Sequence, residues 1–250
     1  MQHEPYQSVK TPASSSLQDR IRLTLEEDLR SGQLLPGMAI NEPALCARFG
    51  ASRTPVREAL LLLAAKGLVD IRPRSGIYVR QLEARELVAM MEGLAELEGV
   101  LARLAAIRIS APLAARLDAA LHCTAERALA DDAEGYAQAN AELHEIIYEA
   151  SGNAFIVEQT RLVRLRITPY RGRMFEKPGR LARSQAEHEA VVGAIRAGHG
   201  EAAAEAMRTH ISMGGRAFAD MVLGAPSLAP EHPRPRTRRP QGGTKQGSLG

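Results

Sequence analysis

Cysteine is scarce in this 250-residue sequence, and long apolar runs are absent. The two cysteines, Cys46 and Cys123, lie in segments with helical apolar periodicity and have no C-x-x-C partner. We therefore expect two small buried thiols, and neither a disulfide framework nor a cysteine-based zinc site. No apolar run approaches the roughly 20 residues that cross a bilayer, and the first 16 residues lack the apolar segment of a signal peptide. These absences predict a cytoplasmic protein that does not contact a membrane.

Common catalytic motifs are missing as well. The sequence contains no H-E-x-x-H pair, no G-x-S-x-G turn and no glycine-rich phosphate-binding loop. The pattern therefore gives little support to an enzyme, although a metal-dependent enzyme stays open as the alternative if histidines gather around a metal.

Charge is distributed unevenly along the chain, although the net charge is only +3. Residues 53–80 carry six basic residues against two acidic ones, whereas residues 81–224 carry 16 basic and 20 acidic residues. The six are Arg53, Arg57, Lys66, Arg72, Arg74 and Arg80. A short basic segment followed by a mildly acidic remainder favours a small module that meets a polyanion, joined to a larger module that does not.

The length favours two domains, and the composition indicates where they begin and end. Residues 1–16 and 225–250 are rich in Pro, Gly, Ser and charge and nearly free of large apolar residues, so we expect a disordered arm and a disordered basic tail. Between them we predict a DNA-binding domain over 17–80 and an all-helical domain over 81–224.

Three short helices are expected in the first domain. Apolar residues recur at every fourth position from Leu17 to Leu29, and Gly32 then supplies a stop. Asn41 can cap a second helix that ends at Gly50. A third helix starts with Ser52 as its capping residue, carries a proline within its first turn and runs to a glycine stop.

A hairpin is expected directly after the third helix. Val69 and Ile71 precede a Pro-Arg-Ser-Gly turn, and Ile77, Tyr78 and Val79 follow it. Three helices that end in a hairpin form a winged helix-turn-helix. Beyond Arg80 the hairpin signals stop and Ala/Leu-rich helical stretches follow, so the second domain is predicted to be an antiparallel helical bundle and the fold class mainly α. The expected helices span about 83–108, 112–131, 133–151, 154–170, 179–198 and 200–223.

The segment SRTPVREAL, which starts at Ser52, carries the clearest DNA-binding signal. Arg53 and Arg57 are four residues apart and therefore point the same way, while Val56 and Leu60 form an apolar face opposite them. The N-terminal end of such a helix can enter the major groove, where arginine donates two bonds to a guanine edge. A solvated basic face is the alternative interpretation for two arginines taken alone.

Residues 35–79 closely resemble the winged-helix domain of the GntR family of bacterial regulators, with SRTPVREAL and GLVDIRPRSGIYV as its specific motifs. The resemblance implies DNA contacts in the recognition helix and the wing. By this resemblance or by their place beside the wing turn, the predicted contact residues are Ser52, Arg53, Thr54, Arg57, Arg72, Arg74 and Gly76. The chain departs from many relatives at Pro43, where they carry a polar residue in the second helix, so the resemblance does not extend to the backbone contact made there.

Histidines in the second domain suggest a metal site. Asn140 and His144 lie four apart on one expected helix, while His188 and His210 lie on two others. Side chains at i and i+4 can bind one ion, and further helices of a bundle can complete its coordination. Solvated or hydrogen-bonded histidines are the alternative. His122, His199 and His232 show no such arrangement.

Residues 83–222 resemble the helical ligand-binding domain of the FadR-type (FCD) branch of GntR regulators, above all in ELHEIIYEASGN, RSQAEHEAVVGAI and EAAAEAMRTHI. In that branch an Asp and three His hold a metal, and the matching positions are Asn140, His144, His188 and His210. Asn in place of Asp donates less charge and should lower metal affinity. Zinc is the expected ion, and nickel and manganese fit the same ligands.

The resemblance also implies a small carboxylic acid as effector, since family effectors are mostly of this class. Its charge can pair with a cation, and Arg164, Arg166 and Arg171 are the candidates. Arg166 shares a face with Leu162, which makes it the expected inward-pointing group, and a solvated basic stripe is the alternative. The segment MMEGLAELEGVLARL lacks, near its centre, the Arg that often clamps ligand in relatives.

The sequence thus predicts a transcriptional regulator, expected to be a repressor, that binds a palindromic double-stranded operator as a homodimer and responds to its effector. In the enzyme alternative, Glu145 and Glu187 adjoin predicted ligands, but each points about 100° away along its helix and is not placed to activate a metal-bound water. Within regulators, a mixed α/β sensor would need strand patterns that the second half lacks. A DNA-binding protein without a sensor is the remaining alternative.

Overall fold

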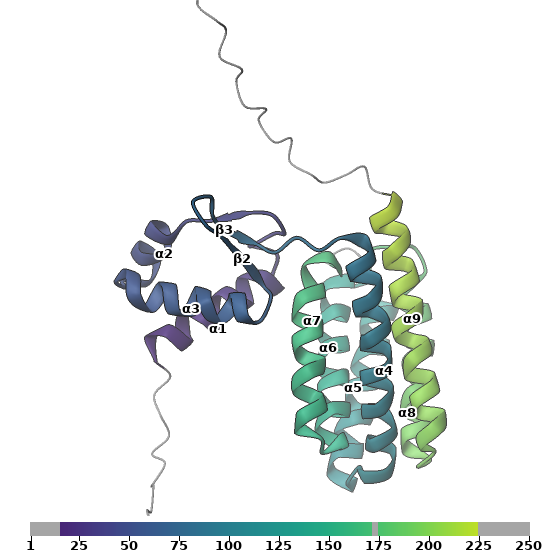
Figure 1. The fold of residues 1–250 in the computed structure, drawn as a ribbon. Coiled ribbons are helices and arrows are strands. Elements are labelled where there is room, and N and C mark those ends of the chain that lie inside the picture. Colours follow the sequence, from purple (N-terminus) through teal and green to yellow (C-terminus); the bar gives the residue numbers. More distant parts are fainter. Residues whose placement is uncertain (1–15, 172–174, 225–250) are drawn as a thin grey trace, which may run out of the picture.

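The N-terminal part of the chain folds as three helices and a small sheet. The computed structural model describes residues 16–171 and 175–224, so most of the expected N-terminal arm, the basic tail and His232 lie outside the described residues. The first elements are α1 (Leu17–Arg30), β1 (Ala39–Ile40), α2 (Glu42–Phe49), α3 (Arg53–Ala65), β2 (Val69–Arg72) and β3 (Gly76–Val79). They form the separate unit at the left of Figure 1.

The ends of these helices follow local chemistry. Asn41 caps α2, since its Oδ1 accepts a bond of 3.0 Å from the Ala44 N–H, and Gly50 ends that helix in the left-handed conformation. Ser52 stands at the capping position of α3, but its side chain makes no cap hydrogen bond. The expectation that its hydroxyl caps the helix is therefore wrong, and the exposed hydroxyl is available to a partner outside the chain.

The hairpin forms as expected, and a third strand joins it. β2 and β3 pair antiparallel, with Val69 opposite Val79 and Arg72 opposite Gly76. β1 pairs with the other edge of β3, which gives the strand order β1-β3-β2. Two residues are too few to show an alternating pattern, so sequence reasoning missed β1. Arg74 has a φ of 64° and Gly76 a φ of 119°, and this pair of unusual conformations turns the wing.

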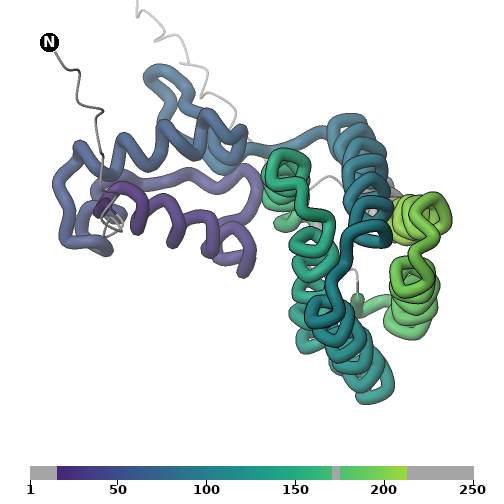
Figure 2. The backbone as a smooth tube through the Cα atoms, turned by 90° about the horizontal axis from the view of Figure 1, so that it is seen from below, coloured from purple at the N-terminus to yellow at the C-terminus, as the bar shows by residue number. Residues whose placement is uncertain are grey.

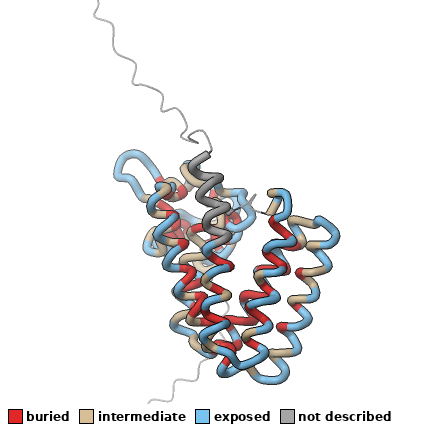
Figure 3. The backbone as a smooth tube through the Cα atoms, turned by 90° about the vertical axis from the view of Figure 1, so that its right-hand side faces the viewer, coloured by how far each residue is buried: buried red, intermediate tan, exposed pale blue. Residues whose placement is uncertain are grey.

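The second part of the chain is a bundle of long helices, and the structure confirms the expected mainly α fold. The helices are α4 (Ala84–Arg108), α5 (Ala111–Leu129), α6 (Ala133–Ser151), α7 (Ala154–Arg171), α8 (Arg180–Arg196) and α9 (Gly200–Gly224). Each coincides with a predicted helix to within two residues. Their buried positions face inward along the bundle, as Figure 3 shows. Among the described residues, no helix is long and apolar enough to cross a membrane.

Each part has its own hydrophobic core. Val56, Leu60 and Leu63 of α3 are fully buried in the N-terminal cluster, and Leu94 and Leu143 belong to the bundle cluster. Cys46 and Cys123 are free thiols, as expected, but each is only partly buried. α7 is the bundle helix that lies beside the N-terminal unit, and both Figure 1 and Figure 2 show it there.

Candidate functional site: a DNA-contacting face and a histidine centre

The N-terminal end of α3 presents its polar residues outward. Ser52, Arg53, Thr54 and Arg57 are all exposed, whereas Val56 on the opposite side is fully buried. This division places the predicted base-reading residues on one free face while the apolar face fixes the helix in its core. The first turns of a helix also offer unpaired backbone N–H groups, which suit phosphate oxygens.

Arg57 already has an intramolecular partner. Its Nε donates a hydrogen bond of 2.7 Å to a carboxylate oxygen of Glu42, at the start of α2, and 62% of the Arg57 side chain remains exposed. Sequence reasoning missed this pair because its members are separated by a helix and a turn. A negative charge therefore stands beside the face that the arginines would present to phosphate. Pro43, the departure from the family pattern, lies in the first turn of the same helix, where its missing N–H costs no helical bond.

The wing presents the remaining predicted DNA contacts. Arg72, Arg74 and Gly76 are exposed at the tip of the hairpin. The Arg72 guanidinium lies 4.7 Å from the centre of the Tyr78 ring, and the Tyr78 hydroxyl donates to the Ser75 carbonyl at 2.9 Å. The aromatic ring thus holds one arginine in place and closes the turn, which leaves a cationic loop aimed at solvent.

Three predicted metal ligands meet inside the bundle. His144 of α6, His188 of α8 and His210 of α9 are buried, and each offers a ring nitrogen within 4.8 Å of those of the other two. The ring centres of His188 and His210 are 4.5 Å apart. Three helices far apart in sequence therefore bring their imidazoles to one point, which is the ligand set that divalent transition metals favour.

Each histidine is held from outside through its Nδ1. The Nδ1 of His144 lies 2.7 Å from Glu98 Oε2, and the Nδ1 of His210 lies 2.8 Å from Glu187 Oε2. The Nδ1 of His188 lies 3.3 Å from the Tyr136 hydroxyl. An outer partner on one ring nitrogen fixes the orientation of the ring and leaves Nε2 as the nitrogen for a metal.

Burial and charge set the protonation of the centre. Burial lowers the pKa of His188 well below its ordinary value, and neighbouring His210 and His144 lower it further. Burial would raise the pKa of Glu98, but Arg164 and His144 outweigh it and hold this pKa far below the ordinary range. His188 is thus a neutral imidazole and Glu98 a carboxylate at neutral pH, as metal binding requires.

The residues present fit a metal ion. His188 Nε2 is buried and has no hydrogen-bond partner among the described residues, a costly state for a polar atom unless something else binds it. Asn140 lies one turn before His144 on the same side of α6 and is 6% exposed. Its ligation stays a prediction, as does the identity of the ion.

Two of the three candidate arginines of α7, Arg164 and Arg166, point to different neighbours. Arg164 points into the bundle, where its Nε donates to Glu98 Oε1 at 2.7 Å. The expectation that Arg166 points inward is wrong: its Nε donates to the Lys66 carbonyl of the N-terminal unit at 2.7 Å. Two helical positions rotate a side chain by about 200°, which separates the two residues. Nothing is described for the Arg171 side chain.

Sequence reasoning assigned no place in the centre to four residues that surround it. A signal existed for Glu98, since it occupies the apolar stripe of α4 that includes Leu94 and Leu101, and a charge at such a position needs a buried partner. Arg180 is only 4% exposed and lies 3.2 Å from Glu187. The contacts of Tyr136 and Glu187 cross between helices, so no local pattern indicated them. Glu187, which the sequence places beside His188, contacts Nδ1 of His210.

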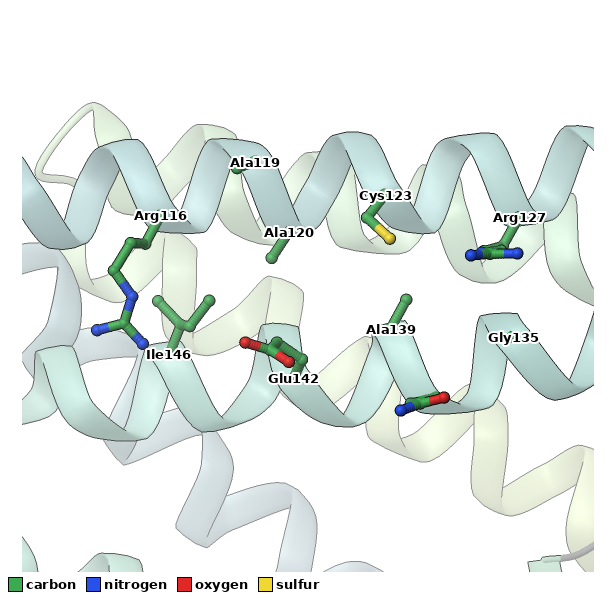
Figure 4. Close-up of a pocket in the computed structure, with 10 residues that line it drawn as sticks. Arg116, Ala119, Ala120, Cys123, Arg127, Gly135, Ala139, Glu142 and Ile146 are labelled. Atoms are coloured by element: carbon green, nitrogen blue, oxygen red, sulfur yellow. The ribbon is translucent and has the colours of Figure 1, made fainter.

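A separate groove lies between α5 and α6. Its volume is about 470 Å³, and the walls include Cys123 and Glu142, with Arg116 and Arg127 towards its two ends (Figure 4). Both arginines are held by acidic neighbours, at 2.8 Å and 3.0 Å respectively. None of its lining residues was a predicted site residue, and none belongs to the histidine centre.

Comparisons with known proteins agree with the two parts of the chain. Residues 17–79 match the family model of bacterial regulatory proteins of the gntR family, and residues 89–213 match that of the FCD domain. The chain is 29% identical over 203 residues to a "Probable D-xylose utilization operon transcriptional repressor" of Paenarthrobacter nicotinovorans, which covers 81% of this chain and 87% of that protein.

Two further matches come from Escherichia coli. The HTH-type transcriptional repressor RspR of strain K12 is 38% identical over 63 residues, covering 25% of this chain and 28% of that protein. The solved structure of McbR/YncC shares the fold with a TM-score of 0.72 at 22% identity, and the match covers 82% of this chain and 98% of that chain. The matched family and relatives are transcriptional regulators, which answers the enzyme alternative. The chain therefore belongs to the GntR family of bacterial regulatory proteins, within the branch that carries an FCD domain.

Proposed function

We propose that this regulator is a cytoplasmic repressor whose homodimer binds a palindromic operator and whose bundle holds a divalent metal ion, zinc in the first place, together with a small carboxylic acid. His144, His188 and His210 would bind the ion, with Asn140 as a fourth ligand. The bound ion would supply open coordination positions for the oxygens of the acid. The observation that carries the proposal is the buried group of three imidazoles, each oriented through Nδ1.

Charges around the centre support an anionic effector. Arg164 pairs with Glu98 and Arg180 pairs with Glu187, and the Nε of Arg180 is buried and has no hydrogen-bond partner among the described residues. A guanidinium in this state gains from a carboxylate that reaches it. We therefore add Arg180 to Arg164 as a cation for the effector, in place of Arg166.

The metal site can be tested by elemental content. Wild-type protein stripped with a chelator and incubated with zinc should retain about one ion per chain after desalting, whereas the double variant His144→Ala, His188→Ala should retain almost none. His122→Ala is the matched control, because that side chain is 77% exposed and lies outside the centre. Full zinc content in the double variant would rule out the site. A thermal-shift screen of carboxylic acids on zinc-loaded protein would then identify the effector class.

The DNA-contacting face can be tested by operator titration at fixed salt. Arg53→Ala should weaken binding by about 1–3 kcal/mol, which is about 5- to 150-fold, because a bidentate guanine contact is lost. Arg85→Ala is the control, since this arginine is 85% exposed on the helical bundle. Unchanged operator affinity in the Arg53 variant would contradict the proposal that α3 is the recognition helix.

A further inference from the structure

α7 contacts both the histidine centre and the DNA-binding unit. Along a single turn, Arg164 and Ile167 face the bundle, whereas Leu165 and Arg166 face the N-terminal unit. Leu165 packs against the N-terminal core, and Ile167 is fully buried in the bundle core. The helix is therefore wedged between the two parts of the molecule rather than covering only one of them.

The bundle side of α7 is tied to the centre by two successive contacts. Arg164 pairs with Glu98 at 2.7 Å, and the other carboxylate oxygen of Glu98 lies 2.7 Å from Nδ1 of His144. Glu98 is fully buried, and the Arg164 side chain is 17% exposed. A buried, doubly engaged carboxylate cannot shift without moving both partners, so a displacement of the His144 ring is passed to α7.

The opposite side of α7 holds the end of the recognition helix. Arg166 donates to the carbonyl of Lys66, the residue that caps the C-terminus of α3. A cation at this position satisfies a carbonyl that has no helical partner and meets the negative end of the helix dipole. The approach depends on Gly67, since a Cβ there would lie 3.2 Å from the guanidinium. Arg166 thus anchors α3 at the end opposite its DNA-contacting residues.

A second contact anchors the linker between the two parts. The Tyr170 hydroxyl accepts a bond of 2.6 Å from the Leu82 N–H and donates to the Arg80 carbonyl at 3.4 Å. Tyr170 follows Arg166 by one turn of α7, so the recognition helix and the linker are held by the same stretch of helix.

The backbone hydrogen bonding of α7 is interrupted in this stretch. Pro169 lies inside the helix and has no N–H to donate to the Leu165 carbonyl, and the Thr168 hydroxyl competes for the Arg164 carbonyl at 2.8 Å. Such a turn bends more readily than the rest of the helix. This deformable turn begins at Arg164, the residue that contacts Glu98.

We propose that α7 transmits the state of the histidine centre to the recognition helix, with Arg164 as its input and Arg166 as its output. This inference rests on the proposed metal-linked regulation. If His144 held an ion, a displacement of its ring would pass to Glu98 and Arg164 through their contacts, the turn before Pro169 would adjust, and the hold of Arg166 on the end of α3 would change. The recognition helices then present a different spacing to DNA.

Hydrogen exchange of the metal-free full-length protein tests the physical link without any ion. The amides of Gly67 and Leu68, bonded to the carbonyls of Ala64 and Leu63, report on the end of α3. Arg164→Gln, which touches only the bundle side, should raise their exchange at least about fivefold, as should Arg166→Gln. Arg161→Gln is the control on the same helix, since Arg161 is 58% exposed and pairs with Glu145. Unchanged exchange at these amides in a folded Arg164→Gln variant would overturn the inference.

Operator titration with and without zinc tests the function of the link. In the wild type, zinc should change the operator Kd by about 5- to 150-fold in one direction. Arg166→Gln should reduce this ratio to within about twofold of unity while the zinc affinity stays as in the wild type. A wild-type ratio in this variant would overturn the inference. If instead the wild type holds no zinc or its Kd ignores zinc, the proposed function fails, and the exchange measurement alone decides on α7.

Discussion

Glu42 stands beside the arginines that are proposed to read DNA, and its charge opposes theirs. Its carboxylate accepts from Arg57 at 2.7 Å and is partly exposed. Phosphate must compete with this pair, and because the pair is exposed, water screens it and it adds little to stability. We therefore expect Glu42 to limit affinity for DNA without contributing much to the stability of the fold.

Glu42→Gln should consequently raise the affinity for duplex DNA by about two- to fivefold at low salt, for operator and unrelated sequence alike. The gain should fade as salt increases, because exposed charges are screened. Fluorescence anisotropy at two salt concentrations measures both effects. Glu158→Gln, a surface carboxylate of α7, is the control and should change neither. A loss of affinity would show instead that Glu42 holds Arg57 in its binding position.

Glu98 is the residue on which the histidine centre depends most, since it orients His144 and neutralises Arg164. Glu98→Gln keeps the shape but removes the charge, so zinc affinity should fall by about 10- to 100-fold. The buried guanidinium also loses its partner, at a cost of about 3–5 kcal/mol in the free energy of unfolding.

Zinc titration calorimetry and denaturant unfolding of the metal-free protein separate these two effects of Glu98→Gln. Glu96→Gln is the control, two residues away on α4 and 71% exposed, and should alter neither quantity. Equal zinc affinity in the Glu98 variant would mean that His144 is oriented by packing alone.

At the scale of elements, sequence patterns predicted the elements that are long enough to show a regular apolar periodicity. The bundle helices are long and amphipathic, so their spacing and caps located them to within two residues. β1 is two residues long and is defined only by its pairing with β3, which no local pattern encodes. Arg166 was assigned to the wrong face because α7 buries two faces at once, against different neighbours. Histidine spacing identified three helices, but the outer partners Tyr136 and Glu187 depend on how those helices pack.

Gly99 allows α4 and α9 to pack closely against each other. A Cβ on Gly99 would lie 3.0 Å from Arg208 Cγ and 3.2 Å from the Ala204 carbonyl oxygen. The carbonyl belongs to the backbone of α9, the helix that carries His210, and cannot move aside by a rotamer change. Gly93 lies on the same helix, is exposed, and has nothing within 4 Å of its Cβ position.

The two glycines make a matched pair of substitutions. Gly93→Ala should raise the free energy of unfolding by about 0.5–1 kcal/mol, because alanine loses less backbone entropy in a helix. Gly99→Ala should lower it by about 1–3 kcal/mol, since the added methyl forces the helices apart. Denaturant unfolding compares them directly. Equal stabilisation by both would show that α4 and α9 can separate without cost.

At the scale of the whole molecule, one chain carries one α3 and one wing, which in the proposed function would together cover a single half-site. A homodimer with two-fold symmetry would present two, related by the same symmetry as a palindromic operator. The spacing between them depends on how firmly each DNA-binding unit is held to its bundle. Three residues of α7 hold the DNA-binding unit in a defined position. Leu165 contacts the N-terminal core, Arg166 contacts the end of α3, and Tyr170 contacts the linker.

Operator spacing should therefore be strict. Inserting five base pairs between the half-sites turns one of them to the opposite side of the duplex, so the affinity should fall to that of a single half-site, a loss of at least about 100-fold. Inserting ten base pairs returns the half-site to the original side of the duplex but moves it about 34 Å along the axis. Because a unit held by α7 cannot reach that far, the affinity should stay low. Gel-shift titration of the three operators measures this, with Arg161→Gln as the control protein. Recovery at ten base pairs in the wild type would mean that the linker at Arg80–Glu83, and not α7, sets the distance between the recognition helices.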